Sequence, residues 1–223
     1  INKCATLVVK PINFVNPINY EDPSFFIGSN KLPKTDNYTY LGIPFDESLS
    51  LKPIQSKLNS NLNVKLNSYF RFLINNSIPL PLKKYVLISF ILSLVLYYAP
   101  LFGSNKNRCS KAQKIINRGL YWSYGFKSRN SYVSLYDITR ELRIPPLSAI
   151  CAISQLRCFR KWKNSLCIIN HLTNNIPTMS HYSWTKESRT LDKKLNGKRT
   201  SEIKKFYWER DVFKPSKAKK AII

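Results

Sequence analysis

The chain has 223 residues, of which 43% are hydrophobic, so its composition excludes wholesale disorder and allows one large domain or two small ones. It carries 36 lysines and arginines against 12 aspartates and glutamates, a formal net charge of +24. That imbalance predicts a polyanionic partner, and nucleic acid is the commonest one.

The charge changes near residue 50. Residues 1–50 hold four basic and five acidic side chains, a net charge of −1, whereas residues 51–188 hold 20 basic and three acidic ones, a net charge of +17. Residues 189–223 hold 12 basic and four acidic side chains, a net charge of +8. We therefore expect a functional boundary near residue 50, with the nucleic-acid surface after it.

Short strands joined by turns are predicted for the first 50 residues. The apolar and β-branched runs are Cys4–Val9, Ser24–Ile27 and Tyr38–Ile43, with proline, asparagine and aspartate between them. In the third run, Gly42 indicates a bulge or a place where another backbone or a ligand comes close. An antiparallel hairpin or small sheet is expected here.

Helical periodicity replaces this pattern from residue 51. Apolar residues recur at three- and four-residue spacing from Ile54 to Leu73, which predicts a first helix. Further helices are predicted over Leu82–Ala99, Ser110–Tyr124, Ser134–Leu142, Leu147–Trp162 and Leu166–Leu172. The pattern fades after about residue 175. The sequence thus predicts an α+β chain with a β segment at 1–50, a helical bundle at 51–170 and a basic, partly helical and loosely packed tail at 171–223.

The second helical segment contains an uncharged stretch, Tyr85–Phe102, of 18 residues. This is close to the roughly 20 residues that span a bilayer. Basic residues lie on both flanks, so no charge asymmetry sets an orientation. Serines, tyrosines and Pro100 within it favour a buried core helix, and a membrane helix is the alternative.

The chain ends and thiols suggest an intracellular fragment. The first residue is Ile1 and Met179 is the single methionine, which favours a piece of a longer protein, with a removed leader as the alternative. The five cysteines are odd in number and lack the spacing of a disulfide framework, so reduced thiols are expected.

Three segments in this order resemble the region that follows the catalytic palm motif in reverse transcriptases of non-LTR retrotransposons. Asn2-Lys3-Cys4 resembles the palm motif whose lysine follows the active-site hairpin. The Tyr-Leu-Gly core of Tyr38–Phe45 is similar to the primer grip, and Glu141–Leu147 is similar to the thumb and post-thumb helices. The resemblance covers residues 1–165. It implies a fragment of an RNA-directed DNA polymerase comprising the end of the palm, the primer grip and a helical thumb.

The resemblance also implies that this chain alone does not polymerise. Reverse transcriptases use two magnesium ions held by palm aspartates, whose hairpin would precede Ile1, and the chain contains no Asp-Asp pair. No cofactor is expected on this chain, and Mg²⁺ belongs to the complete polymerase with its upstream fingers and palm. By resemblance, Lys3 is a candidate general acid toward pyrophosphate, and an exposed lysine at a strand start is the alternative.

The same resemblance assigns Tyr40, Leu41 and Gly42 to the primer grip. A glycine lets the backbone approach the primer, and aromatic neighbours can pack on sugars or bases, so these residues would position the primer end without reading sequence. An ordinary core strand that closes a small sheet is the alternative.

Clustered cations on the predicted helices are candidate phosphate contacts along an RNA template, an RNA–DNA hybrid or a DNA duplex. Such contacts fix register and make the affinity salt-dependent. For any single lysine, a solvated face is the alternative. The candidates are Lys111, Lys114, Arg118, Lys127, Arg129, Arg157, Arg160 and Lys161.

No metal site is expected from the thiols and imidazoles near the end of the chain. Cys151, Cys158, Cys167, His171 and His181 are separated by six, eight, three and nine residues, unlike the pairs two to four residues apart that bind zinc. Core cysteines are the preferred interpretation, and Cys167 with His171 keeps the spacing of two ligands on one helix.

Two functional alternatives remain from the sequence. One is a non-catalytic RNA-binding or ribosome-associated basic protein derived from a decayed element. The other is a membrane protein spanning at Tyr85–Phe102. The preferred interpretation predicts an intracellular, nuclear location and no membrane partner.

Overall fold

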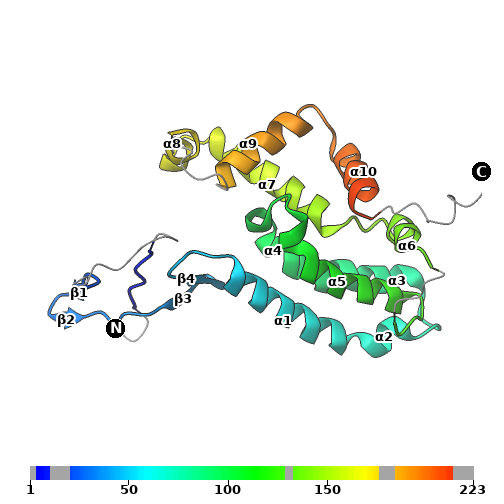
Figure 1. Cartoon of the computed structure of the whole chain (residues 1–223). Coiled ribbons are helices and arrows are strands. Elements are labelled where there is room, and N and C mark those ends of the chain that lie inside the picture. Colours follow the sequence, from blue (N-terminus) through cyan, green and yellow to red (C-terminus); the bar gives the residue numbers. More distant parts are fainter. Residues whose placement is uncertain (1–3, 11–20, 129–132, 176–183, 213–223) are drawn as a thin grey trace, which may run out of the picture. The chain divides into compact units, whose positions relative to one another are not determined.

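The computed structural model describes residues 4–10, 21–128, 133–175 and 184–212 (Figure 1). Two short antiparallel sheets precede a series of helices, so the predicted α+β class is confirmed. The chain forms two compact units, Ile1–Lys57 and Leu58–Ile223. Their boundary lies inside the first helix, α1 (Lys52–Ser68), a few residues beyond the predicted boundary near residue 50.

The N-terminal unit is built from two hairpins. Strand β1 (Phe26–Ile27) pairs with β2 (Asn30–Lys31), and β3 (Asn37–Tyr40) pairs with β4 (Ile43–Asp46). The predicted single strand over 38–43 is wrong, because Leu41 and Gly42 form the turn between β3 and β4. Their φ angles are 47° and 81°, and positive φ at both central residues is typical of the two-residue turn that matches the twist of a hairpin.

The predicted strand over Cys4–Val9 is also wrong. Only Thr6 forms a bridge, parallel to Lys34, with hydrogen bonds from the Thr6 N–H to the Pro33 carbonyl and from the Thr35 N–H to the Thr6 carbonyl, both 3.0 Å. β-branched side chains favour extended backbone, but a strand needs a neighbour along its whole length. Pro33 has no N–H to donate, which limits the pairing at this edge.

Helices account for most of the remaining described residues. They are α1, α2 (Phe70–Ile74), α3 (Leu80–Val86), η1 (Leu87–Leu92), α4 (Ser93–Phe102), α5 (Lys106–Ser123), α6 (Leu135–Glu141), α7 (Leu147–Lys163), α8 (Ile168–Asn175), α9 (Trp184–Leu195) and α10 (Thr200–Asp211). The first predicted helix is interrupted at Tyr69, whose φ and ψ of −95° and 5° leave the helical region.

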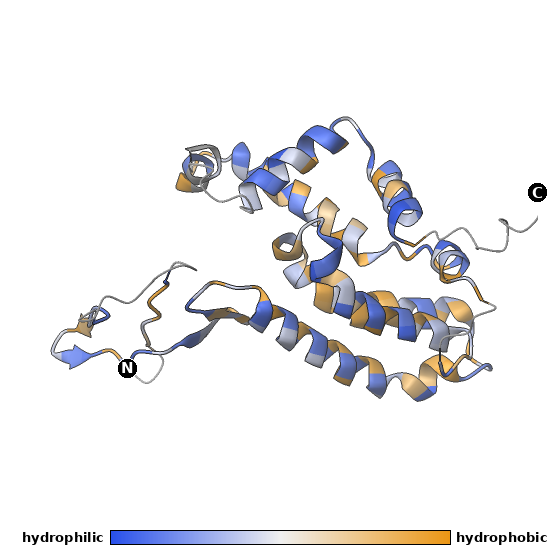
Figure 2. Cartoon of the chain, in the orientation of Figure 1, coloured by the Kyte–Doolittle hydropathy of each residue, from blue (hydrophilic) through white to orange (hydrophobic). Residues whose placement is uncertain are grey.

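The core of the helical unit lies where α1, α4, α5 and α7 bury their apolar faces. Leu62, Leu66 and Leu120 are fully buried. Gly119 on α5 permits a close helix approach, because a Cβ atom there would lie 2.7 Å from Leu66 Cδ1. Figure 2 shows apolar residues concentrated on α4 and hydrophilic residues predominating on α9.

The predicted apolar helix is part of a continuous helical segment, Leu80–Phe102, whose central turns over η1 widen to a π-helix. By length and composition alone this segment could cross a membrane, and 44% of its most apolar window is buried. One side, including Ile91 and Val95, is packed in the core, whereas Tyr85 and Tyr97 are more than half exposed. The buried core helix stays the prediction, with the membrane helix as its alternative.

Helices α9 and α10 differ from the loosely packed tail predicted for residues 171–223. Figure 1 shows α7 running between α4 and the pair α9 and α10. Leu191 and Leu195 on α9, with Ile203 and Tyr207 on α10, join one buried cluster with apolar residues of α7. Each helix buries only three side chains among many lysines, which is why the periodicity is faint in the sequence.

Candidate nucleic-acid interface

Helix α5 presents two predicted phosphate contacts to solvent. The N-cap residue of the helix is Asn105, whose side-chain oxygen accepts a hydrogen bond from the Asn107 N–H at 2.9 Å. Cys109, Ile116 and neighbouring residues are buried, and Lys111 and Lys114 are exposed one turn apart. Among the described residues, neither lysine forms an ion pair. Their charges are therefore available to a polyanion.

Arg118, predicted to extend this face, is used inside the protein. Its Nη2 donates to Asn63 Oδ1 of α1 at 2.8 Å, and its guanidinium lies 5.2 Å from the Trp122 ring centroid. Its Nε is buried with no hydrogen-bond partner among the described residues. The side chain thus links α5 to α1 and stacks on its own helix, so its geometry favours a structural role over a phosphate contact.

The cations at the end of α7 also divide into exposed side chains without ion pairs and one side chain that is used inside the protein. Arg157 and Lys161 are exposed and form no ion pair among the residues that the structure describes. Arg160 instead donates from Nε to Asp192 Oδ1 on α9 at 2.8 Å. The pair is partly exposed, so its contribution to stability is modest. Of the three predicted contacts on α7, two remain available.

The two groups of available cations are on packed helices but not on one shared face. Helix α5 contacts α7 through Cys109, whose Sγ is 3.7 Å from Cys151 Sγ, and through Gln113, whose Oε1 accepts from the Leu147 N–H at 2.7 Å. At 3.6 residues per turn, Lys111 and Lys114 lie on the opposite side of α5 from these contacts. The face of α5 therefore points away from α7.

Of the remaining predicted residues, Lys127 is described and two are not. Lys127 is exposed in the loop after α5, and its carbonyl accepts a hydrogen bond from Trp122 Nε1 at 3.1 Å. Lys3 and Arg129 lie outside the described residues. Their predicted roles, as a general acid and a phosphate contact, stay predictions.

The predicted primer-grip residues occupy the tip of the β3–β4 hairpin. Tyr40 is 59% exposed and Leu41 is 73% exposed, so neither is part of a core strand. Lys57 Nζ donates to the Gly42 carbonyl at 3.0 Å, which ties the turn to the start of α1 within the N-terminal unit. An exposed aromatic ring beside a left-handed glycine turn can contact a sugar or a base.

The core interpretation holds for Cys151, whereas Cys158 is only partly buried and Cys167 is exposed. Cys151 is fully buried on α7, and the hydrogen bond with Cys109 together with burial raises the pKa of its thiol. Cys167, just before α8, and His171, on α8, are both exposed. His181 lies outside the described residues. The described residues contain no group of three or more His, Cys, Asp or Glu side chains that could hold a metal.

Sequence reasoning missed a third group of cations, on α9, α10 and the loop between them. Lys194, Lys198 and Arg210 lie 5.0, 5.6 and 5.8 Å from the ring centroid of Phe206. The signal that could have found them is the four-residue spacing of Leu191 with Leu195 and of Ile203 with Tyr207. This spacing is typical of two helices that each bury one face. Ordered helices hold these cations in defined positions.

Comparison with known proteins gives no match: neither a protein-family model, nor a curated protein, nor a solved structure resembles this chain.

Proposed function

We propose that this chain is the carboxy-terminal part of a reverse transcriptase of the non-LTR retrotransposon type, and that it binds a primer–template duplex without catalysing polymerisation. The helical unit would hold the duplex through its phosphates, and the β3–β4 turn would contact the primer end. The magnesium-binding aspartates would belong to the preceding part of the polymerase.

The observation that carries the proposal is the set of unpaired cations on α5 and α7. Lys111, Lys114, Arg157 and Lys161 are exposed and lack ion pairs among the described residues, while other arginines nearby are used in the fold. Unpaired surface cations raise the free energy of the folded state through mutual repulsion, which a phosphate backbone relieves. A polyanionic partner would relieve this repulsion.

The β3–β4 turn supports the more specific part of the proposal. Tyr40 and Leu41 are exposed next to Gly42, at the residues that resemble a primer grip. Exposed apolar side chains at a hairpin tip are unfavourable in water, so contact with a sugar or base would bury them. This feature favours a polymerase fragment over a general RNA-binding protein, for which phosphate contacts alone would suffice.

A salt series tests the phosphate contacts. The affinity of the full chain for a labelled RNA–DNA hybrid would be measured by fluorescence anisotropy at increasing KCl. Each phosphate contact contributes roughly 0.7–0.9 to the slope of log affinity against log salt. The α5 pair and the α7 pair lie on different faces, so we expect replacing one pair to reduce the slope by about 1.5 and replacing both pairs to reduce it by about 3. The test variant is Lys111→Gln, Lys114→Gln, Arg157→Gln and Lys161→Gln.

A matched variant separates local contacts from net charge. Lys52→Gln, Arg71→Gln, Lys193→Gln and Lys205→Gln removes the same four charges from exposed positions elsewhere. We expect its slope to stay close to that of the wild type. Equal losses for the two variants, or a wild-type affinity that does not respond to salt, would refute the interface.

The primer grip is tested with a hybrid that has a recessed primer end and the same hybrid with blunt ends. We expect a preference of about fivefold for the recessed end, corresponding to roughly 1 kcal/mol, and its loss in Tyr40→Ala. Tyr38→Ala, a neighbour on the same strand with a half-buried ring, serves as the comparison. Phosphate-dependent binding without any preference for the primer end would support the non-catalytic alternative instead.

A further inference from the structure

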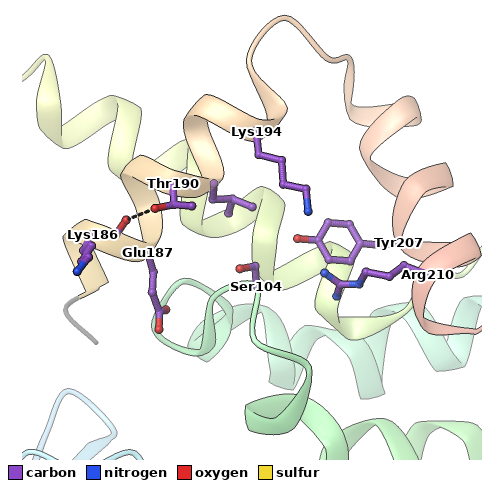
Figure 3. Close-up of a pocket in the computed structure, with 8 residues that line it drawn as sticks. Ser104, Lys186, Glu187, Thr190, Lys194, Tyr207 and Arg210 are labelled. Atoms are coloured by element: carbon purple, nitrogen blue, oxygen red, sulfur yellow. Dashed lines mark hydrogen bonds between the residues drawn. The ribbon is translucent and has the colours of Figure 1, made fainter. Parts of the chain in front are cut away.

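Helices α9 and α10 and the loop after α4 line a second candidate site, an open pocket of about 320 Å³ (Figure 3). It lies wholly within the helical unit. None of the predicted phosphate contacts lines it. The lining residues are Ser104, Lys186, Glu187, Thr190, Leu191, Lys194, Tyr207 and Arg210.

The pocket carries an excess of positive charge, because its one acidic lining residue is already neutralised. Both carboxylate oxygens of Glu187 accept hydrogen bonds from Arg108, at 2.8 and 2.7 Å. Among the described residues, Lys194 forms no ion pair, and Arg210 is paired with the neighbouring Asp211. Such an excess attracts an anion and repels a cation.

The neighbouring carboxylate of Asp211 is compensated as well. It accepts hydrogen bonds from Arg210 Nε and Nη2, at 2.6 and 2.7 Å, and one from the Ser148 hydroxyl, and it lies 3.8 Å from Lys106 Nζ. These bonds orient the guanidinium of Arg210, which also lies 4.3 Å from the Tyr207 ring centroid. The arginine is thereby held in place before any ligand arrives.

Three of the polar lining residues, Lys194, Tyr207 and Arg210, lie close together at one end of the pocket, and Lys186 points away from them. Figure 3 shows the Lys194 ammonium and the Arg210 guanidinium directed toward the hydroxyl of Tyr207, with the Ser104 hydroxyl close by. The Tyr207 side chain is 1% exposed, and burial raises its pKa although Arg210 and Ser104 act in the opposite direction. Its hydroxyl therefore remains protonated at neutral pH and can donate a hydrogen bond.

We propose that this pocket binds a phosphate monoester, with Lys194 and Arg210 supplying charge and the Tyr207 and Ser104 hydroxyls supplying hydrogen bonds. Charged donors bind phosphate oxygens with short, strong hydrogen bonds, and Arg210 contributes through the part of its guanidinium that does not bond to Asp211. A volume of about 320 Å³ is at the lower end for small-molecule sites, so it suits a phosphate with one attached sugar better than a duplex. The site does not depend on duplex binding by α5 and α7.

Calorimetric titration of the full chain tests this site, with inorganic phosphate and with a nucleoside 5′-monophosphate as probes at constant ionic strength. We expect saturable binding of both. Lys194→Gln should weaken it about tenfold, as loss of a charge-assisted hydrogen bond predicts, and Tyr207→Phe should weaken it about threefold. Lys193→Gln removes the same charge from the adjacent exposed residue of α9, outside the pocket, and should change the affinity less than twofold.

The outcomes separate the sources of the phosphate and the two proposals. If the nucleoside monophosphate binds more tightly than inorganic phosphate, the pocket also contacts the sugar. If the two bind equally, the pocket recognises the phosphate group alone. The Lys111, Lys114, Arg157 and Lys161 variant should bind both probes as the wild type does, whatever its effect on duplex binding. Absence of saturable binding, or equal losses in Lys193→Gln and Lys194→Gln, would overturn the proposal. Tyr207 is buried, so Tyr207→Phe could disturb the fold. Lys194 is exposed, so Lys194→Gln keeps the fold intact and tests the site independently.

Discussion

The N-terminal unit and the helical unit differ in what holds them together. Among the described residues before Leu58, Ile54 is the one buried hydrophobic side chain, and Phe25, Phe26 and Ile27 are about half exposed or more. The helical unit buries apolar side chains from nearly all of its helices. The charges differ as well: residues 1–57 hold six basic and five acidic side chains, and residues 58–223 hold 30 and seven.

The comparison teaches how topology limits burial. A two-stranded hairpin offers one short face and is marginally stable alone, whereas packed helices share a common interior. We therefore expect turn geometry to govern the N-terminal unit and side-chain packing to govern the helical unit. The high charge of the helical unit is tolerated because its core supplies the stability that charge repulsion opposes.

The largest expected effect is the loss of a core side chain in the helical unit. Leu62 is fully buried, so Leu62→Ala should lower the free energy of unfolding by about 2–5 kcal/mol, measured by urea denaturation. Phe26→Ala, at a side chain that is 60% exposed in the N-terminal unit, should cost no more than about 0.5 kcal/mol. A comparable cost at Phe26 would mean that the N-terminal unit has a core of its own.

Asp211 tests whether polar contacts also hold the helical unit together. Burial acts to raise its pKa, but the hydrogen bonds from Arg210 and Ser148 outweigh burial and hold the pKa below the ordinary value. Asp211→Asn should cost about 1–3 kcal/mol at neutral pH, because it weakens buried hydrogen bonds to a charged group.

The pH dependence gives a second measure of the same contact. Because the pKa of Asp211 is lower in the folded state, its stabilisation is complete above the unfolded value of about 3.9 and is lost as the pH falls through the folded value. The difference between wild type and Asp211→Asn should therefore be constant above about pH 5 and shrink in stronger acid. A difference that does not change with pH would exclude the ionic contribution.

Arg118 and Lys114, on the same helix, separate cations that hold the fold from cations that face solvent. Arg118→Gln should lower the free energy of unfolding by about 1–2 kcal/mol, since the Asn63 hydrogen bond and the Trp122 contact are both weakened. Lys114→Gln should leave the free energy of unfolding within about 0.5 kcal/mol of the wild type. It should reduce duplex affinity more than Arg118→Gln does. Thermal denaturation and anisotropy on the two variants check this, and the reverse order would refute the assignment.

The smallest effect is expected at the hairpin turn. Gly42 has a φ of 81°, so Gly42→Ala should destabilise the β3–β4 hairpin by about 1 kcal/mol, with little effect on the helical unit. Amide hydrogen exchange resolves the hairpin from the helices. Gly42→Asn should restore much of the loss, because asparagine tolerates the left-handed region. Equal exchange in all three proteins would show that the turn does not limit the hairpin.

Local sequence patterns were sufficient to predict the fold class and most of the helices. The helix predicted over Leu147–Trp162 is observed at Leu147–Lys163, because its apolar spacing and the prolines before it are local signals. The hairpin turn was less visible, since Leu41 is an unusual residue for positive φ and the run reads as one strand. Helix was expected in part of the basic segment, but the positions and packing of its two helices were not predicted because each buries so few side chains.

The sequence by itself determined the excess of positive charge and the helices that carry it, because both depend on composition and on spacing within a few residues. Only the tertiary structure decided which cations are used in the fold. Arg108 meets Glu187 from 79 residues away, and Arg160 meets Asp192 from 32 residues away. Such pairs depend on how the helices pack, which no local pattern encodes.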